Sequence, residues 1–382
     1  MSCSKRHSGE GELPPEILAT ELLPRLPAKS LLRFKSVCKS WRDLISDPHF
    51  IESHLHQQSQ AASISSNGTI ISGPPNLNVL FGKFNVLFSI VVGSGDATAK
   101  PIGFDNSYCP LCSCNGLVCV ETNLMELALW NPCTQSFRLL PKWKDDLPDL
   151  DTERLTCGFG YDAEIKDYKL VVIGRKSGRV SQVLVFTLAS NSWRRISDTN
   201  LPFYCMEGGM FINGFIYWPV LNYCCDALIC FDIHNEVFNE LRIPDAFLSQ
   251  VTRNEEIIFN IGELGGCLVL VWELSDGDPD HNSDLSHEVW ILKENWVKMY
   301  SINLSKSFCT EYHTPIMPTG VISVSKKKKK SHFEIVYASC NGRLFSYNLS
   351  TNRFRHFKAP GLWYVKSRKA KTYIESLVSL HQ

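Results

Sequence analysis

The sequence contains no long hydrophobic run and carries no net charge. Its apolar stretches are all shorter than the roughly 20 residues that a membrane-spanning helix needs. The first twelve residues are polar and lack the apolar stretch of a secretory signal. Because 39 basic residues balance 39 acidic ones, no overall field attracts nucleic acid or an anionic membrane. These absences predict a cytoplasmic or nuclear protein that binds neither nucleic acid nor membrane.

The residue patterns of common enzyme active sites are also missing. The sequence has no Gly-x-Ser-x-Gly element, His-Glu-x-x-His element, phosphate loop or dinucleotide fingerprint. The acidic groups Asp145-Asp146 and Asp276, Asp278 and Asp280 lack the glycine and terminal glutamate of a calcium loop, and we interpret them as solvated loops. The sequence therefore predicts no catalytic residue and no cofactor.

The fifteen cysteines are odd in number, scattered, and often placed inside apolar runs. In a reducing compartment this pattern predicts buried free thiols. Cys109-x-x-Cys112 has the spacing of half a zinc site, but no second well-spaced pair of Cys or His follows nearby. We therefore predict thiols on or beside a strand and no bound metal.

The segment from Leu13 to Leu55 has the period of helices. Pro14 and Pro15 suit a first helical turn, and Pro24 and Pro27 end that helix. A second helix is expected after Pro27 and a third from Asp47-Pro48. The apolar positions recur at steps of three and four, namely Ile17, Leu18 and Leu22, then Leu31, Phe34, Cys38, Trp41 and Ile45, then Phe50, Ile51 and Leu55. So small a unit buries little surface alone, so a partner completes the burial, unless the helices are a cap on the next domain.

The string LPPEILATELLPRLPAKSLLRFKSVCKSWRDLISDPHFIESHL strongly resembles a plant F-box, which we place at residues 10–56. The resemblance implies binding to a Skp-type adaptor and, through it, to a cullin/RING ubiquitin ligase. It also implies a set of residues that either face the adaptor or form the core of the motif. These are Leu13, Pro14, Ile17, Leu18, Leu22, Leu26, Pro27, Leu31, Val37, Cys38 and Trp41.

Beyond the helices the composition changes twice. Residues 57–76 are rich in Ser, Gln, Asn, Gly and Pro, which is typical of a linker. From 77 to 382, short β-rich runs are separated by turn residues every ten or so positions. The runs are Val79–Val92, Leu117–Val120, Lys169–Ile173, Val183–Leu188, Phe215–Trp218 and Cys267–Trp272. This spacing indicates an all-β sandwich, barrel or propeller.

An internal repeat favours the propeller over a stacked sandwich. Five segments each hold two aromatic residues seven or six positions apart, namely Trp130/Phe137, Phe186/Trp193, Phe231/Phe238, Trp290/Trp296 and Tyr347/Phe354. A four-residue hairpin loop would place residues seven apart opposite each other on one face, and a loop shortened by one residue would do the same for residues six apart. Asn-Gly turns at 115–116, 213–214 and 341–342 mark further hairpins. The repeat length predicts six to eight blades, with Tyr373–Leu380 as the strand that closes the ring.

Residues 110–360 also resemble the F-box-associated, kelch-like domain of plant F-box proteins. The resemblance rests on the segments Cys114–Val118, Leu129–Pro132, Gly158–Asp162, Asp167–Lys169 and Asn191–Arg194. It implies the substrate-recognition subunit of an SCF-type ubiquitin ligase, whose β domain holds an unidentified target protein. The alternative is an enzyme or carbohydrate-binding propeller with a helical cap.

Surface loops are the expected place for target recognition, because loops vary without disturbing the blades. Length and polarity select Asp145–Glu153, Leu221–Ala227 and Ser275–Ser286. The five lysines Lys326–Lys330 are either a nuclear-import or anion-binding element or an exposed loop kept from the core by repulsion.

Overall fold

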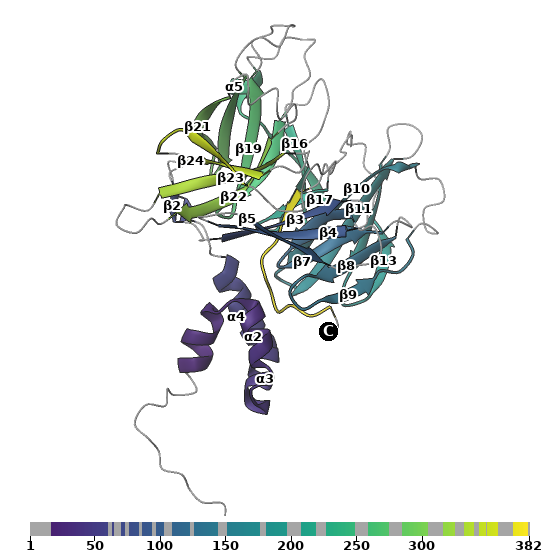
Figure 1. Ribbon diagram of the computed structural model, residues 1–382. Helices are drawn as coiled ribbons and strands as arrows, with labels where there is room; N and C mark the ends of the chain where they lie inside the picture. Colours follow the sequence, from purple (N-terminus) through teal and green to yellow (C-terminus); the bar gives the residue numbers. More distant parts are fainter. Residues whose placement is uncertain are drawn as a thin grey trace, which may run out of the picture.

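The computed structural model has a helical module at the N-terminus and, above it in the view of Figure 1, a ring of β-sheets. It describes residues 17–59, 63–64, 70–72, 76–83, 86–93, 97–102, 109–122, 126–143, 151–175, 181–196, 208–218, 227–248, 259–274, 285–304, 316–324, 332–339, 344–348, 350–357 and 370–380. The helical module ends at Ser59, and a short two-stranded sheet follows it, made of β1 (Ser63–Ile64) and β2 (Ile70–Ser72).

The helical module consists of short helices in sequence. They are the π-helix η1 (Leu18–Leu22), the 3-10 helix η2 (Leu23–Arg25), α2 (Ala28–Phe34), α3 (Lys39–Ser46) and α4 (Pro48–Ser59). The single helix predicted after Pro27 was wrong, because the structure divides it at Cys38. That residue is extended, with φ −159° and ψ 169°, and its Sγ accepts the Trp41 backbone N–H at 3.5 Å. A capping side chain thus starts a new helix inside one continuous apolar period.

The core of the helical module is completed by the β domain. Leu23, Leu31, Ile45 and Phe50 are buried together with Ala28. The same cluster contains two residues far along the chain, Cys133 and Leu377. The helices therefore do not bury their apolar side alone, and the module and the β domain share one continuous packing cluster.

One buried histidine ties α4 to the start of the module. His54 Nε2 lies 2.9 Å from the carbonyl oxygen of Leu26, and the ring stacks on Phe50. A carbonyl can only accept, so Nε2 donates the hydrogen bond. Burial lowers the pKa of His54 below its ordinary value of 6.5, although the hydrogen bond to Leu26 opposes this shift. The folded module therefore holds a neutral His54.

A lowered histidine pKa makes the module sensitive to acid. The unfolded chain takes up a proton below pH 6.5 and the folded chain resists it, so stability falls as the pH drops through that region. We expect the denaturant midpoint of the module to be lower at pH 5.5 than at pH 7.5. His54→Gln keeps an N–H donor but does not titrate, and it should remove most of this difference. An equal pH effect in wild type and variant would contradict the assignment.

Six four-stranded antiparallel sheets form the β domain. Five of them use strands that are consecutive in the sequence. The second and third sheets hold β6 (Cys109–Cys114), β7 (Leu117–Glu121), β8 (Leu127–Asn131) and β9 (Ser136–Leu139), then β10 (Asp151–Asp162), β11 (Asp167–Arg175), β12 (Ser181–Thr187) and β13 (Ser192–Arg195). The fourth holds β14 (Met210–Ile212), β15 (Phe215–Trp218), β16 (Ala227–Asp232) and β17 (Val237–Arg242), after which comes the short helix α5 (Asp245–Leu248).

The fifth and sixth sheets complete the consecutive set. They hold β18 (Phe259–Leu264), β19 (Cys267–Leu274), β20 (Leu285–Leu292) and β21 (Trp296–Leu304), then β22 (Ile316–Val324), β23 (His332–Ser339), β24 (Leu344–Asn348) and β25 (Arg353–His356). The first sheet combines both ends of the domain, with β26 (Ala370–Thr372) beside β3 (Asn76–Lys83), β4 (Val86–Gly93) and β5 (Ala97–Ile102). The β-rich run Val79–Val92 is therefore a hairpin of β3 and β4.

The sheets close into a ring, so the domain is a six-bladed propeller. The first strands of successive blades contact one another, β6 with β10, β10 with β14, β14 with β18, and β18 with β22. The ring closes because β3 and β26 contact β22 on one side and β6 on the other. This agrees with the predicted range of six to eight blades. The closing strand was predicted at Tyr373–Leu380, which was wrong, because β26 at Ala370–Thr372 pairs with β3 instead. The segment after it has another role, described below.

The repeated aromatic pairs are confirmed in four blades. Trp130 stands opposite Phe137, Phe186 opposite Trp193, Phe231 opposite Phe238, and Tyr347 opposite Phe354. The fifth pair was wrong as a direct pair, because Trp290 stands opposite Lys298 and Trp296 opposite Leu292. The three-residue connection there covers residues 293–295, one position later than a direct pair requires, so the second tryptophan takes a diagonal position. The first aromatics of the confirmed pairs are buried, so they pack the blades and do not contact a ligand.

A capping device recurs in the hairpin loops. The Asn or Asp just before each loop accepts backbone N–H groups two and three residues ahead through Oδ1, at Asn131, Asp162, Asp232 and Asn348. The fourth loop residue then has positive φ, at Gln135, Lys166, Glu236 and Asn352. The predicted Asn-Gly turns at 115–116 and 213–214 are confirmed, each with both residues at positive φ. The third, at 341–342, lies outside the described residues.

Candidate partner-docking site

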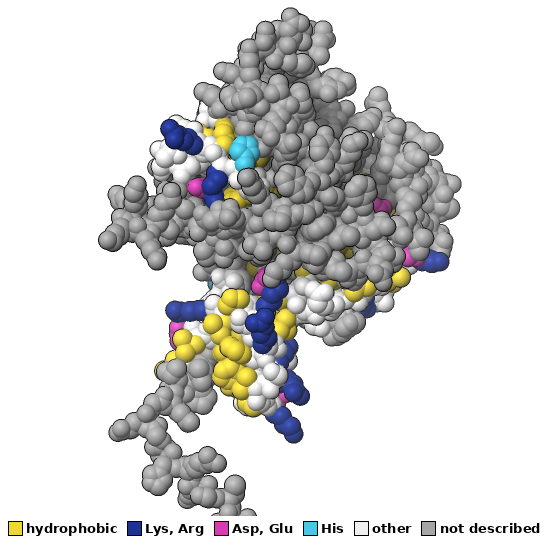
Figure 2. Space-filling view, in the orientation of Figure 1, with side chains coloured by type: hydrophobic (Ala, Val, Ile, Leu, Met, Phe, Trp, Pro, Cys, Tyr) yellow, Lys and Arg dark blue, Asp and Glu magenta, His cyan; other side chains and the backbone are white. Residues whose placement is uncertain are grey.

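Exposed apolar side chains gather on the helical module. Ile17, Leu22 and Val37 are 43%, 41% and 61% exposed. Figure 2 shows hydrophobic side chains spread over the surface of these helices. A cluster of large exposed apolar residues is typical of a protein–protein contact. We call these three exposed residues together the apolar rim.

The structure separates the eleven residues expected to face a partner or form the core. Ile17, Leu22, Pro27, Val37 and Cys38 are exposed. Leu31 is fully buried, which makes it a residue of the shared core, while Leu26 and Trp41 are half-buried. Trp41 packs edge-on against Phe34 with ring centroids 5.4 Å apart. Leu13, Pro14 and the side chain of Leu18 lie outside the described residues.

Basic side chains border the apolar rim. Arg33, Lys39 and Arg42 are exposed on the helices that flank Val37, and dark-blue atoms edge the module in Figure 2. Burial lowers the pKa of Lys35, which lies in the turn between α2 and α3. Arg25 is already paired with Glu21 at 3.0 Å. The rim therefore suits a partner with an apolar patch bordered by acidic groups.

The opposite side of the module rests on the propeller. Ile51 and Leu55 of α4 pack against the cluster between the blade of β6–β9 and the blade of β10–β13. Lys29 pairs with Glu375 at 2.6 Å, and Glu52 with Lys166 at 3.6 Å. The module is thus attached to the β domain, yet the apolar rim stays open. The helices therefore pack on the β domain, as the alternative of a helical cap expects, but they also keep exposed apolar side chains.

These attachments identify the two faces of the propeller. Cys133 lies in the β8–β9 loop and Lys166 in the β10–β11 loop, so these loops mark the near face, on which the module sits. Neighbouring strands are antiparallel, so successive connections alternate between the faces. The connections β9–β10, β15–β16 and β19–β20 therefore leave from the opposite, far face. These three hold the loops selected for target recognition.

The selected loops lie mostly outside the described residues. Their ends do not, since residues 151–153 belong to β10, Ala227 to β16 and residues 285–286 to β20. Lys326–Lys330, Asp145-Asp146 and the acidic residues Asp276, Asp278 and Asp280 also lie outside. Because β22 ends at Val324 and β23 begins at His332, the lysine run connects two strands of one blade.

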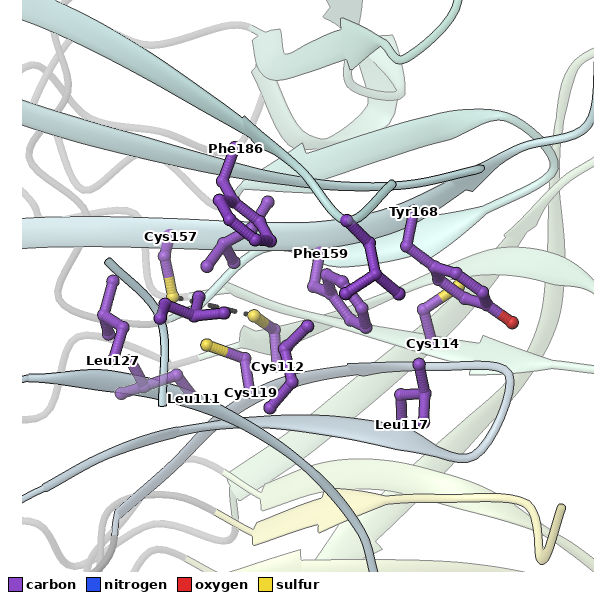
Figure 3. Packing of buried hydrophobic residues seen from close by; sticks show 14 of the residues in the cluster. Leu111, Cys112, Cys114, Leu117, Cys119, Leu127, Cys157, Phe159, Tyr168 and Phe186 are labelled. Atoms are coloured by element: carbon purple, nitrogen blue, oxygen red, sulfur yellow. Dashed lines mark hydrogen bonds between the residues drawn. The ribbon is translucent and has the colours of Figure 1, made fainter. Parts of the chain in front are cut away.

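Three thiols meet inside the propeller where the sequence suggested a Cys-x-x-Cys pair. The sulfurs of Cys112, Cys119 and Cys157, from β6, β7 and β10, all lie within 4.8 Å of one another (Figure 3). Cys157 comes from a neighbouring blade, so no spacing rule could find it. Burial raises the pKa of the Cys112 thiol well above its usual range, and hydrogen bonds to the other two thiols add to this. Metal binding needs thiolates, so we interpret the cluster as apolar core.

The comparisons with known proteins agree with this geometry. Residues 96–380 match the model of the F-box associated beta propeller domain, and residues 11–57 match the F-box-like model. The chain is an F-box protein with an F-box associated β-propeller domain. From here on the helical module is called the F-box.

This F-box protein has relatives in Arabidopsis thaliana. It is 29% identical to "F-box protein CPR1", over 84% of this chain and 79% of the relative. It is 28% identical to "F-box/kelch-repeat protein At3g23880", over 96% and 95%. A crystal structure of a six-bladed lectin from Aleuria aurantia covers 79% of the chain and 96% of the lectin at 11% identity and a TM-score of 0.40, which carries no inference about a ligand. Among the described helices, none is long and apolar enough to cross a membrane.

Proposed function

We propose that this F-box protein is the substrate-recognition subunit of an SCF-type E3 ubiquitin ligase. Its F-box binds a Skp-type adaptor, and its propeller binds the target protein. The observation that carries the proposal is the apolar rim, whose three side chains stay exposed while other apolar side chains of the module are buried in a cluster shared with the propeller. A helix face of this kind is stabilised by a partner that covers it.

The adaptor contact uses the exposed members of the predicted set. Ile17, Leu22 and Val37 supply the apolar surface, and Pro27 and Cys38 are exposed beside them. The neighbouring Arg33, Lys39 and Arg42 favour an adaptor with an acidic border. Leu31 contributes by shaping the helices and not by contact. Leu13, Pro14 and Leu18 remain part of the proposed surface on the strength of the resemblance.

The target contact is placed on the far face. Its three long connections, holding Asp145–Glu153, Leu221–Ala227 and Ser275–Ser286, can vary without disturbing the blades. Because the F-box occupies the near face, adaptor and target do not compete for the same surface. The protein then acts by raising the effective concentration of the target beside the ubiquitin-charged enzyme. The cullin/RING subunits reached through the adaptor carry out ubiquitin transfer, in the cytoplasm or nucleus.

Co-expression of the full chain with a Skp-type adaptor tests the proposal. We expect a stable 1:1 complex in size-exclusion chromatography, and ubiquitination of bound proteins after a cullin/RING pair is added. A comparison of proteins trapped by the full chain and by a chain lacking residues 1–60 would then name the target. If the properly folded chain binds no Skp-type adaptor, the ligase function is wrong, and the helices are only a cap on the propeller.

A further inference from the structure

The last described segment, Tyr373–Leu380, is neither helix nor strand, yet it is largely buried. It follows β26 and forms the yellow thread that runs from the ring past the F-box to the blade of β6–β9 (Figure 1). Five of its eight side chains are buried, namely those of Tyr373, Ser376, Leu377, Val378 and Leu380. Irregular backbone is usually exposed. We call this segment the C-terminal strap.

On one side the strap is bound to the blade of β6–β9. Asn131 Nδ2 donates to the carbonyl oxygen of Val378 at 2.8 Å and to that of Ser376 at 3.2 Å. Arg138 donates to the carbonyl oxygen of Leu380 at 2.9 Å. The Asn115-Gly116 turn lies so close that a Cβ on Gly116 would come within 2.3 Å of Ser376 Oγ. The blade therefore holds the strap backbone in one path.

On the other side the strap holds the F-box. The Leu377 side chain belongs to the same buried cluster as Leu31, Ile45 and Phe50. Two residues earlier, Glu375 accepts from Lys29 of α2 at 2.6 Å. A single short segment thus supplies both an apolar and an ionic contact to the F-box.

Asn131 shows how the blade is adapted to the strap. Its Oδ1 caps the β8–β9 loop, as Asp232 does at the same position in the blade of β14–β17. Asp162 caps the β10–β11 loop in the same way. A carboxylate is therefore enough for the loop. Only an amide can also donate, and the Asn131 amide donates to strap carbonyls. The loop thus serves its own hairpin through one atom and the strap through another.

We propose that the C-terminal strap is the mount that fixes the orientation of the F-box on the propeller. The inference rests on the proposed function for its purpose, because a fixed mount sets the distance and direction between bound adaptor and bound target. Effective concentration depends on that geometry, and it falls when a connection lengthens or loosens. Asn131, Glu375 and Leu377 are the positioning residues of this mount.

Asn131→Asp separates the strap from the hairpin. The variant keeps the Oδ1 acceptor for the loop but turns a carboxylate oxygen toward the carbonyls of residues 376 and 378, so the strap should detach. In hydrogen exchange of the full chain, we expect amides of 373–380 and of α4 to exchange at least tenfold faster. Asp232→Asn makes the reverse change at the same position of the blade of β14–β17, where Oδ2 accepts from Asn235 in the loop, and should leave both regions unchanged.

A charge exchange tests the contact to the F-box. Lys29→Glu and Glu375→Lys alone should each speed exchange in α2 and α4, and the double variant should restore it. Small-angle scattering of Asn131→Asp that gives a broader distribution of interatomic distances than wild type, with adaptor binding unchanged, would support the mount. Unchanged exchange in α4 when the strap is released would overturn it. A wild-type chain that binds no adaptor would instead refute the proposed function and leave this result standing.

Discussion

A triple variant with Ile17, Leu22 and Val37 replaced by aspartate is expected to lose adaptor binding by more than 100-fold. The three side chains are exposed in the free protein, so their replacement costs the fold little. Each would bury roughly 1.5–3 kcal/mol worth of apolar side chain in a complex. The variant also buries three charges without partners against the adaptor's apolar patch. Isothermal titration with purified Skp-type adaptor measures the loss.

Other exposed apolar residues of the same chain supply the control. Ile165 and Val237 lie in the β domain and are 53% and 48% exposed. Their replacement by aspartate changes the charge of the whole protein in the same direction. We expect adaptor affinity to stay within about twofold. Equal losses in both variants would show that charge, and not the apolar rim, governs binding.

Stability separates the rim from the core of the F-box. Leu31→Ala removes a fully buried side chain from the cluster that joins F-box and propeller. A loss of about 2–5 kcal/mol in unfolding free energy is typical of such a change. The rim variant should keep the wild-type melting transition. A rim variant that melts early would mean that Ile17, Leu22 or Val37 supports the fold and not a partner.

Replacing Lys169 with methionine is expected to destabilise the propeller by about 3–5 kcal/mol, because it removes the buried cation that pairs with two carboxylates. Lys169 is buried between two blades. Its Nζ lies 2.9 Å from Asp162 and from Glu236, and it donates to the carbonyl oxygen of Ile233 at 2.8 Å. Asp162 belongs to the blade of β10–β13, and Glu236 and Ile233 to the next blade. Unlike the exposed ion pairs, this lysine joins two neighbouring blades inside the protein.

The pH dependence identifies the cause. Burial acts to raise the pKa of Asp162, but hydrogen bonds from Lys169 and His234 outweigh it and hold that pKa below its usual 3.8. The pKa of Glu236 is likewise lowered, against its burial, by Arg194 and Lys169. A carboxyl group whose pKa is lower in the folded chain than in the unfolded chain stabilises the fold at pH values above its unfolded pKa. That stability is lost as the pH falls through the folded pKa. The destabilisation by Lys169→Met should therefore be largest near pH 7 and shrink below pH 4.

A second cation on the same glutamate provides the control. Arg194 pairs with Glu236 but is 48% exposed, and an exposed ion pair contributes about 0–1 kcal/mol. Arg194→Met should therefore change the chemical denaturation midpoint only slightly. Should Lys169→Met prove equally mild at neutral pH, its polar partners must be reached by water, and the blades do not depend on this link.

Local features of the fold were predictable from short stretches of sequence. Two aromatics seven apart with a polar turn between them specify a hairpin, because a four-residue loop puts them opposite each other. The rule failed at Trp290 and Trp296, where the connection of three residues begins one position too late to place the two rings opposite each other. Helical period located the F-box, yet it could not detect the break at Cys38. A break made by one capping atom leaves the apolar period unchanged.

The sequence predicted which residues belong to the candidate site. It did not predict which of them face a partner and which form the core. The apolar positions from Ile17 to Trp41 form one periodic series, so no pattern distinguishes a side chain that faces a partner from one that faces the propeller. Leu31 became core because Cys133 and Leu377 cover it. The thiol cluster was missed for the same reason, since Cys157 reaches Cys112 from another blade.

By itself the sequence determined the local units of this protein: the F-box motif, the hairpins with their aromatic pairs and capped loops, and a repeat of propeller length. Interactions between residues a few positions apart decide these, so a short window contains them. Only the tertiary structure decided that six blades close through β26, that the C-terminal strap lies between F-box and propeller, and which helix face stays open. Those outcomes depend on contacts between residues hundreds of positions apart, whose burial no local pattern records.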